Sequence, residues 1–154
     1  MDAVCPLVSV VVPVYAGQRT IPDLIQRCLA IREGQSGAPS GILQELIFVC
    51  EEPIDGSELL LHKIAKEYSW IQVISLARNS GQHLATAVGI LYSSGDWILT
   101  VDEDLQHPPE LLPQILKEAL EKGYDLLFAR STTRIHASSI YRDLASNASK
   151  LEPG

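Results

Sequence analysis

The feature that most constrains the fold of this chain is an unbroken run of mostly β-branched residues near its start, Val8-Ser9-Val10-Val11-Val12-Pro13-Val14. A strand with one face in water alternates apolar and polar residues, whereas this run is apolar on both faces. The run is also far shorter than the roughly 18 apolar residues that a membrane-spanning helix needs. It therefore predicts a strand that other elements cover on both sides, as in a parallel sheet.

Further apolar runs follow at regular intervals, and segments with helical signals separate them. Strands are predicted at residues 8–14, 46–50, 71–76, 97–101 and 125–129, and helices at residues 21–31, 57–68, 82–92 and 109–122. Thr20 and Ser57 are suitable caps for the first two helices. This alternation predicts an α/β domain with a mostly parallel sheet flanked by helices. The pattern weakens after residue 130, where one more helix is expected at 138–149.

Length and composition set limits on the class of protein. A chain of 154 residues, 46% of them hydrophobic, suits one folded domain. The formal net charge of −7 argues against nucleic acid as the main partner, because a phosphate backbone selects basic surfaces. The three cysteines are widely spaced and include no Cys-x-x-Cys pair, which argues against a zinc site and favours a reducing compartment.

Polar residues that can take part in binding or catalysis follow the end of each predicted strand. They are Tyr15 after the first strand, Glu51 and Asp55 after the second, Arg78 after the third, Asp102 and Asp104 after the fourth, and Arg130 after the fifth. Ligands of open α/β sheets bind beyond the carboxyl ends of the strands. We therefore expect these side chains to gather around one binding site.

Three consecutive carboxylates, Asp102-Glu103-Asp104, follow the fourth strand. Like charges this close are tolerated when they are solvated or when a cation neutralises them. In a strand-like segment Asp102 and Asp104 share one face, Glu103 points to the other, and Gln106 continues the alternation. These oxygens suit a hard cation such as Mg²⁺ or Mn²⁺. On spacing alone, a solvated turn that caps the next helix is an equally good interpretation.

The segment Val-Asp-Glu-Asp-Leu-Gln-His-Pro-Pro-Glu at residues 101–110 resembles the metal-binding segment of family 2 glycosyltransferases. It is closest to the branch similar to dolichol-phosphate mannose synthase and the bacterial polyprenyl-phosphate glycosyltransferases. Blocks at residues 8–15, 55–57, 76–83 and 95–96 resemble further segments of that family, in the same order. The resemblance covers approximately residues 8–130.

The resemblance implies a Rossmann-like GT-A fold and an inverting transfer from a nucleoside-diphosphate sugar to a polyprenyl or dolichyl phosphate. It implies Mg²⁺ or Mn²⁺ as cofactor, and work at the cytoplasmic face of a membrane. Residues 1–130 correspond to the nucleotide-sugar-binding domain, and residues 131–154 to a truncated acceptor-side segment or tail. The site residues that it implies are Pro13, Tyr15, Glu51, Asp55, Arg78 and Asp102 for the donor nucleotide, Asp104 and Gln106 with Asp102 for the metal, and Arg130 for the acceptor phosphate.

The sequence departs from the family pattern at the donor site and in its catalytic residues. Where the family has a pair of aspartates after the second strand, this chain has Cys50-Glu51, and a thiol is a weak acceptor for a base imide. Glu51 has the reach to substitute. No convincing general base occurs, since Asp143 is better explained as a solvated helix carboxylate. The alternative is thus a nucleotide-sugar-binding module of the same fold without turnover.

Two other nucleotide-binding classes fit less well. A nucleotidyltransferase shares the fold and the use of carboxylates, but it would show a Gly-rich basic loop after the first strand. The corresponding residues here, Tyr15-Ala16-Gly17-Gln18-Arg19, are a poor match. A dehydrogenase is disfavoured because no Gly-x-Gly-x-x-Gly follows the first strand.

Overall fold

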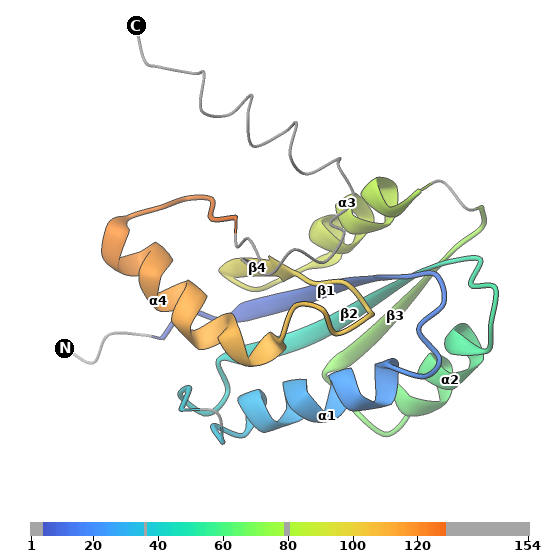
Figure 1. The fold of residues 1–154 in the computed structure, drawn as a ribbon, viewed down its shortest axis with the longest axis horizontal. Helices are drawn as coiled ribbons and strands as arrows, with labels where there is room; N and C mark the ends of the chain where they lie inside the picture. Colours follow the sequence, from blue (N-terminus) through green and yellow to red (C-terminus); the bar gives the residue numbers. More distant parts are fainter. Residues whose placement is uncertain (1–4, 36, 79–80, 129–154) are drawn as a thin grey trace, which may run out of the picture. The chain divides into compact units, whose positions relative to one another are not determined.

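The computed structural model describes residues 5–35, 37–78 and 81–128. The elements along the chain are β1 (Val8–Val14), α1 (Ile21–Arg32), β2 (Leu43–Glu51), α2 (Ser57–Ile64), β3 (Ile71–Leu76), α3 (Gln82–Tyr92), β4 (Trp97–Thr100), the 3₁₀ helix η1 (Pro109–Leu111) and α4 (Leu112–Lys122). Strands and helices therefore alternate as predicted (Figure 1). The chain forms two compact units, Met1–Pro113 and Gln114–Gly154. The whole sheet lies in the first of them.

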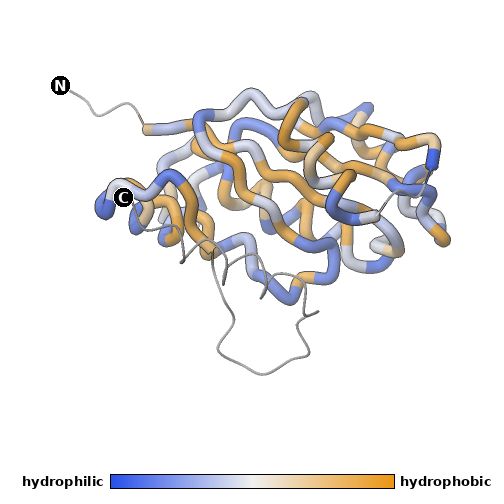
Figure 2. Tube along the Cα trace, turned by 90° about the horizontal axis from the view of Figure 1, so that it is seen from above, coloured by the Kyte–Doolittle hydropathy of each residue, from blue (hydrophilic) through white to orange (hydrophobic). Residues whose placement is uncertain are grey.

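The sheet has four strands in the order β3-β2-β1-β4, and every pairing is parallel. β1 lies between β2 and β4, so that Val11 pairs with Ile47 on one side and with Thr100 on the other. All seven residues of β1 are buried. Its mostly apolar run suits this central position, and Figure 2 shows hydrophobic residues along the segments that cross the middle of the tube.

The helices of the first unit cover both faces of this sheet. α3 contacts β1 and β2, where Ala85 packs in a cluster with Val11, Ile47 and Val49. The helix comes so close to the sheet that a Cβ on Gly89 would lie 2.3 Å from Cγ1 of Val11. α1 and α2 lie on the side opposite α3 (Figure 1). This close packing of α3 on the sheet fixes the start of the helix relative to the carboxyl ends of β1 and β2.

Four details of the predicted elements were wrong. The helix expected at 57–68 is α2, which already ends at Ile64. Ser57 is the first residue of α2, and Gly56 is the N-cap of the helix. The carboxylate of Asp55 accepts the Ser57 N–H, so that Asp55 satisfies a backbone donor at the helix start in place of a Ser57 cap. The helix expected at 109–122 begins as the 3₁₀ turn η1, where two prolines withhold backbone donors. Residues 125–128 form no strand, since no strand of the described residues pairs with them.

The remaining predictions for the C-terminal part lie outside the described residues. These are Ala129 at the end of the expected fifth strand, Arg130, and the helix expected at 138–149. Within the described ranges, none of the helices has the length and apolarity needed to cross a bilayer.

Candidate functional site

The parallel sheet brings several of the predicted site residues to its carboxyl edge. Pro13 is buried within β1, and Tyr15, directly after the strand, leaves half of its side chain exposed. Asp102 lies two residues beyond the end of β4, the neighbour of β1. Because both strands run in the same direction, the loop after β1 and the carboxylate segment after β4 lie beside each other, as hydrogen bonds between them show.

The carboxylate segment is a turn and does not continue β4. Leu105 adopts a left-handed backbone conformation with φ of 62°, which L-residues with a Cβ seldom adopt. Oδ1 of Asp104 accepts the N–H of Gln106 at 3.0 Å across this residue. The expected strand-like alternation of Asp102, Asp104 and Gln106 was therefore wrong. A local hydrogen bond across a strained residue orients Asp104, and both Asp104 and Gln106 are exposed.

Asp102 lies beside the N-terminus of α3. The side chain of Gln82, the first residue of that helix, donates a 2.6 Å hydrogen bond from Nε2 to Oδ1 of Asp102. Nδ1 of His107 lies 3.9 Å from Oδ2. Burial and then the nearby charge of Asp104 raise the pKa of Asp102, against the opposing effects of His107 and Gln82. The charge of Asp104 thus works against ionisation of Asp102, and a cation bound nearby would offset this effect.

Glu103 makes a contact that sequence reasoning did not predict. Its carboxylate accepts the backbone N–H of Tyr15 at 3.1 Å and that of Ala16 at 2.8 Å. Burial raises the pKa of Glu103, and these two N–H donors work in the opposite direction. No pattern around residue 103 indicates this pairing. The glycine at position 17 is the one related feature of the sequence, and the structure explains it: a Cβ there would lie 2.5 Å from Oε2 of Glu103.

Asp55 already uses both of its carboxylate oxygens. Oδ2 accepts the N–H of Gln18 at 3.0 Å, and Oδ1 accepts the N–H of Ser57 at 2.9 Å and its hydroxyl. Burial acts to raise the pKa of Asp55, but the hydrogen bonds from Ser57 and Gln18 together lower it. In this arrangement Asp55 is an ionised brace between the loop after β1 and the start of α2.

Cys50 and Glu51 end β2 and are both buried, with Glu51 only 4% exposed. Burial raises the pKa of the Cys50 thiol to about 12, and the carboxylates of Glu58, Glu103 and Asp55 act in the same direction. The thiol therefore stays protonated at neutral pH and is unsuited to nucleophilic attack. Cys50 is therefore a small core residue of β2.

The oxygen atoms of the carboxylate segment suit a hard divalent cation that is also bound by water and by the phosphates of a substrate. Within the described residues, no three carboxylate, imidazole or thiol side chains converge to form a complete cage. Mg²⁺ and its analogues are commonly held by only one or two carboxylates, together with water and the phosphates of a substrate. Asp102 and Asp104 are two such carboxylates, and Gln106 carries an amide oxygen within the same turn; their role as metal ligands stays a prediction.

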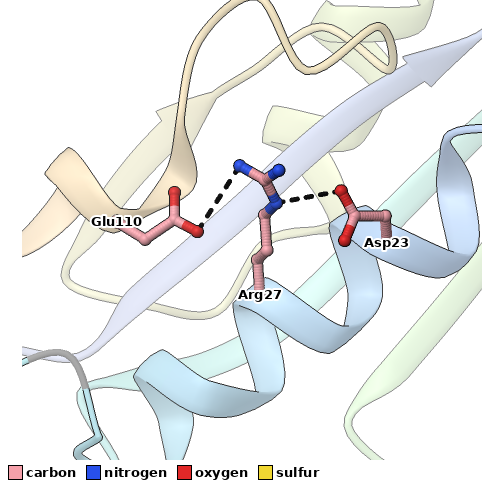
Figure 3. Close-up of polar contacts among 3 residues, drawn as sticks. All are labelled: Asp23, Arg27 and Glu110. Atoms are coloured by element: carbon pink, nitrogen blue, oxygen red, sulfur yellow. Dashed lines mark hydrogen bonds and ion pairs between the residues drawn. The ribbon is translucent and has the colours of Figure 1, made fainter.

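The exit of the carboxylate segment is anchored to α1. Pro109 of η1 is buried, and η1 contacts α1. Figure 3 shows Arg27 of α1 between two carboxylates: its Nε lies 3.0 Å from Oδ2 of Asp23, and its Nη1 lies 3.6 Å from Oε1 of Glu110. The turn that carries Asp102 and Asp104 is thus held at both ends, by β4 and by η1.

The structure supports the two basic residues predicted for the site less directly than it supports the carboxylates. Arg78 is exposed and lies two residues after β3, which pairs with β2 on the side away from β1. Arg130 lies outside the described residues. The structure thus places Tyr15, Asp55, Asp102 and Asp104 on adjoining loops and Pro13 in the strand before them, while the contribution of Arg78 and Arg130 stays a prediction.

Comparisons with known proteins agree with this arrangement. Residues 9–146 match the model of the family described as Glycosyl transferase family 2. The undecaprenyl-phosphate 4-deoxy-4-formamido-L-arabinose transferase of Salmonella paratyphi A is 37% identical over 145 residues, which are 94% of this chain and 42% of that protein. The protein of the same name from Photorhabdus laumondii is 39% identical over 142 residues, 90% of this chain and 41% of that protein. The chain thus spans about two fifths of these relatives.

Two solved structures share the fold. A mannosyltransferase, PcManGT from Pyrobaculum calidifontis in complex with GDP-Man and Mn²⁺, superposes with a TM-score of 0.63 at 19% identity, covering 74% of this chain and 32% of that one. S. aureus TarS 1-349 superposes with a TM-score of 0.62 at 21% identity, covering 88% of this chain and 40% of that one. At such identities the likeness concerns the fold, which is the GT-A fold of glycosyltransferases.

Proposed function

The chain belongs to glycosyl transferase family 2, and we propose that it is the donor-binding part of an inverting glycosyltransferase. The enzyme transfers a sugar from a nucleoside-diphosphate sugar to a polyprenyl or dolichyl phosphate. The observation that carries this proposal is the turn after β4 at the carboxyl edge of a parallel sheet, in which Asp102 accepts a hydrogen bond from Gln82 at the start of α3 and Asp104 follows two residues later. This edge is where ligands of such sheets bind.

The base side of the donor is assigned to the loops after β1 and β2. Pro13 and the half-exposed ring of Tyr15 line the base pocket, and Glu51 and Asp55 lie at the end of β2 and in the loop that follows. Asp55 acts mainly by bracing this pocket, since both of its oxygens already accept hydrogen bonds. Arg78 serves the diphosphate, whose charge an exposed guanidinium can bind in bidentate fashion.

The phosphate side is assigned to the carboxylate turn. Asp104 and Gln106, with Asp102, hold Mg²⁺ or Mn²⁺, and Asp102 also contacts the ribose and diphosphate. A divalent cation at this position neutralises the charge that develops on the diphosphate leaving group. Asp102 is held for this role by Gln82, and Asp104 by the Gln106 N–H. The structural neighbour PcManGT, a mannosyltransferase in complex with GDP-Man and Mn²⁺, supports this assignment.

The acceptor is assigned as a lipid phosphate that Arg130 contacts. The names of the curated relatives support it, because these proteins are undecaprenyl-phosphate sugar transferases. A phosphate acceptor is already ionised at neutral pH, so it needs little help from a general base. We assign residues 1–130 to the donor domain, residues 131–154 to the start of the acceptor side, and the reaction to the cytoplasmic face of a membrane.

One observation favours a second candidate, a donor-binding module without turnover. The buried thiol of Cys50 is protonated and lies where the family places a carboxylate for the base. A module of this kind would still use Asp102 and Asp104 for the cation. The two candidates differ only in catalysis.

A transfer assay separates the two candidates. The protein is incubated with Mn²⁺, undecaprenyl phosphate in detergent, and radiolabelled UDP- or GDP-sugars, and the lipid extract is analysed for a sugar phosphate of inverted anomeric configuration. The enzyme produces such a lipid and releases nucleoside diphosphate in equal amount. Nucleotide binding in calorimetry without any lipid product indicates the module. Absence of both binding and product in the folded protein contradicts both candidates.

A further inference from the structure

The loop after β1, residues 15–18, is held from two sides. On one side the Ile54 N–H donates to the carbonyl of Tyr15 at 3.1 Å, and Gln18 exchanges hydrogen bonds with Asp55 and Gly56 at 3.0 and 3.2 Å. On the other side the N–H groups of Tyr15 and Ala16 both donate to Glu103. This loop carries Tyr15, and its geometry therefore depends on both attachments.

The Glu103 attachment is a close fit. The carboxylate takes two adjacent backbone donors, at 3.1 Å from Tyr15 and 2.8 Å from Ala16, and charged acceptors strengthen such hydrogen bonds. It also packs against Gly17, where even a methyl group would lie 2.5 Å from Oε2. The loop and the carboxylate thus have complementary shapes as well as complementary polarity.

Glu103 lies between Asp102 and Asp104 in the chain, and its contacts differ from theirs. Asp102 binds Gln82, and Asp104 binds the Gln106 N–H, whereas Glu103 reaches the loop after β1. Any movement of Glu103 therefore moves the backbone of its two neighbours. Loss of its carboxylate frees the carboxylate turn and the loop after β1 from each other.

From this geometry we propose that Glu103 is a positioning residue that locks the loop carrying Tyr15 to the turn carrying Asp102 and Asp104. The base side and the cation side of the donor site are thereby formed as one unit. This rests on the proposed function, in which Tyr15 serves the base and the two aspartates serve the cation and diphosphate. Glu103 itself touches neither the cation nor the donor.

The test is calorimetric titration of the 154-residue protein with UDP and with GDP in the presence of Mn²⁺, and with Mn²⁺ alone. Glu103→Ala is compared with Glu103→Gln, which keeps one acceptor oxygen and the size of the side chain. Glu121→Ala, on α4 with 64% of its side chain exposed, is the matched control. We expect Glu103→Ala to weaken nucleotide affinity by about 10-fold or more, in the range known for residues that support a ligand shell. Glu103→Gln is expected to be intermediate.

Amide exchange provides the readout that does not need a ligand. In Glu103→Ala the amides of Tyr15 and Ala16 exchange faster, while the amides of the central strand β1, such as that of Val11, keep their protection. The affinity for Mn²⁺ alone falls by less than the affinity for nucleotide, because the side chains of Asp102 and Asp104 remain.

The outcomes distinguish this proposal from the proposed function. If the wild-type protein binds neither nucleotide with Mn²⁺, the proposed function fails and the positioning role fails with it. If the wild-type protein binds and both Glu103 variants bind equally well, the positioning role is overturned and the proposed function stands. Equal losses of nucleotide and of Mn²⁺ affinity overturn it too, because Glu103 would then be a ligand. Should Glu103→Ala not fold, the near-isosteric Glu103→Gln decides.

Discussion

One buried carboxylate, Glu45, and the carboxylates of the turn after β4 lie at opposite edges of the same parallel sheet, and their surroundings differ. At the amino edge Glu45 is 5% exposed, and its Oε1 accepts the Ser9 hydroxyl at 2.6 Å and both the N–H and the hydroxyl of Ser94. Its Oε2 accepts Nε2 of Gln72 at 2.6 Å. β1, β3 and the turn before β4 each contribute a donor, and the charge is satisfied inside the protein.

At the carboxyl edge the carboxylates repel one another and are more exposed. Asp102 lies near Asp104, and Glu103 lies near Asp104 and Asp55, and each such neighbour raises a pKa. Among the described residues, Asp104 accepts a hydrogen bond through Oδ1 only. The number of hydrogen-bond donors around a carboxylate therefore separates structural carboxylates from candidate ligands. A buried carboxylate with a full set of donors stabilises the fold, and a cluster short of donors is ready for a cation.

The largest effect on stability is expected at the amino edge. Glu45→Ala removes the common acceptor of Ser9, Ser94 and Gln72, of which the Ser9 hydroxyl is buried and the other two residues are exposed. An unsatisfied buried group costs about 1–3 kcal/mol, so we expect a loss of about 2 kcal/mol in the free energy of unfolding by urea. Asp104→Ala, the comparison at the other edge, should change it by less than about 0.5 kcal/mol. Equal losses for the two variants would remove the distinction between the edges.

Removal of the cation should affect only the carboxyl edge. With excess EDTA, calorimetric affinity for UDP or GDP should fall by about 10- to 100-fold, because the phosphates then face unneutralised carboxylates. The urea midpoint of the nucleotide-free protein should not change, since donors within the protein satisfy the charge of Glu45. Nucleotide binding that survives EDTA unchanged would contradict the role given to Asp102 and Asp104.

An added methyl group at Gly17 should have a smaller effect on both properties. In Gly17→Ala the new Cβ would lie 2.5 Å from Oε2 of Glu103 and 2.9 Å from Cδ1 of Ile21, so that the loop must shift. Overpacking of this kind costs about 1–3 kcal/mol, and we expect the lower half of that range because the loop is near the surface. Gly37→Ala provides the contrast, since a Cβ there meets nothing within 4 Å and only its positive φ opposes the substitution. Urea unfolding and nucleotide titration of both variants measure the difference.

The smallest effect is expected at the ion pairs of Arg27. Its partners Asp23 and Glu110 have side chains that are 53% and 41% exposed, so solvent and salt screen the attraction. Arg27→Ala should therefore cost about 0.2–1 kcal/mol, and less in 1 M salt. A loss well above this range at high salt would show that the exit of the carboxylate turn depends on Arg27 through packing.

Most of the fold followed from sequence because its signals are local. The apolar run of residues 8–14 predicted β1 with the correct bounds. The helix predicted at 82–92 and the strand ahead of Asp102 are the elements that meet at the site. The fifth strand at 125–129 was not recovered in the described residues. An apolar run such as Leu126-Leu127-Phe128 shows only that a segment can be buried, and a strand also needs a hydrogen-bonding neighbour.

The candidate site was predicted in its residues but less well in its geometry. The sequence shows that residues 102 and 104 are aspartates. It does not show the positive φ of Leu105, which makes the segment a turn. The contact of Glu103 with the loop after β1 joins residues 87 and 88 positions apart in the chain. Such long-range contacts depend on the strand order, and no periodicity of the sequence encodes them.

The measurement that tests the central claim most directly is calorimetric titration of Asp104→Asn with Mn²⁺ and UDP or GDP, beside Asp96→Asn as control. Asp96 lies at the amino edge, where its Oδ2 accepts the Leu7 N–H. Our account predicts that Asp104→Asn loses Mn²⁺-dependent nucleotide binding and keeps the unfolding free energy of the wild-type protein, and that Asp96→Asn keeps its binding. Unchanged nucleotide binding in Asp104→Asn would contradict the account.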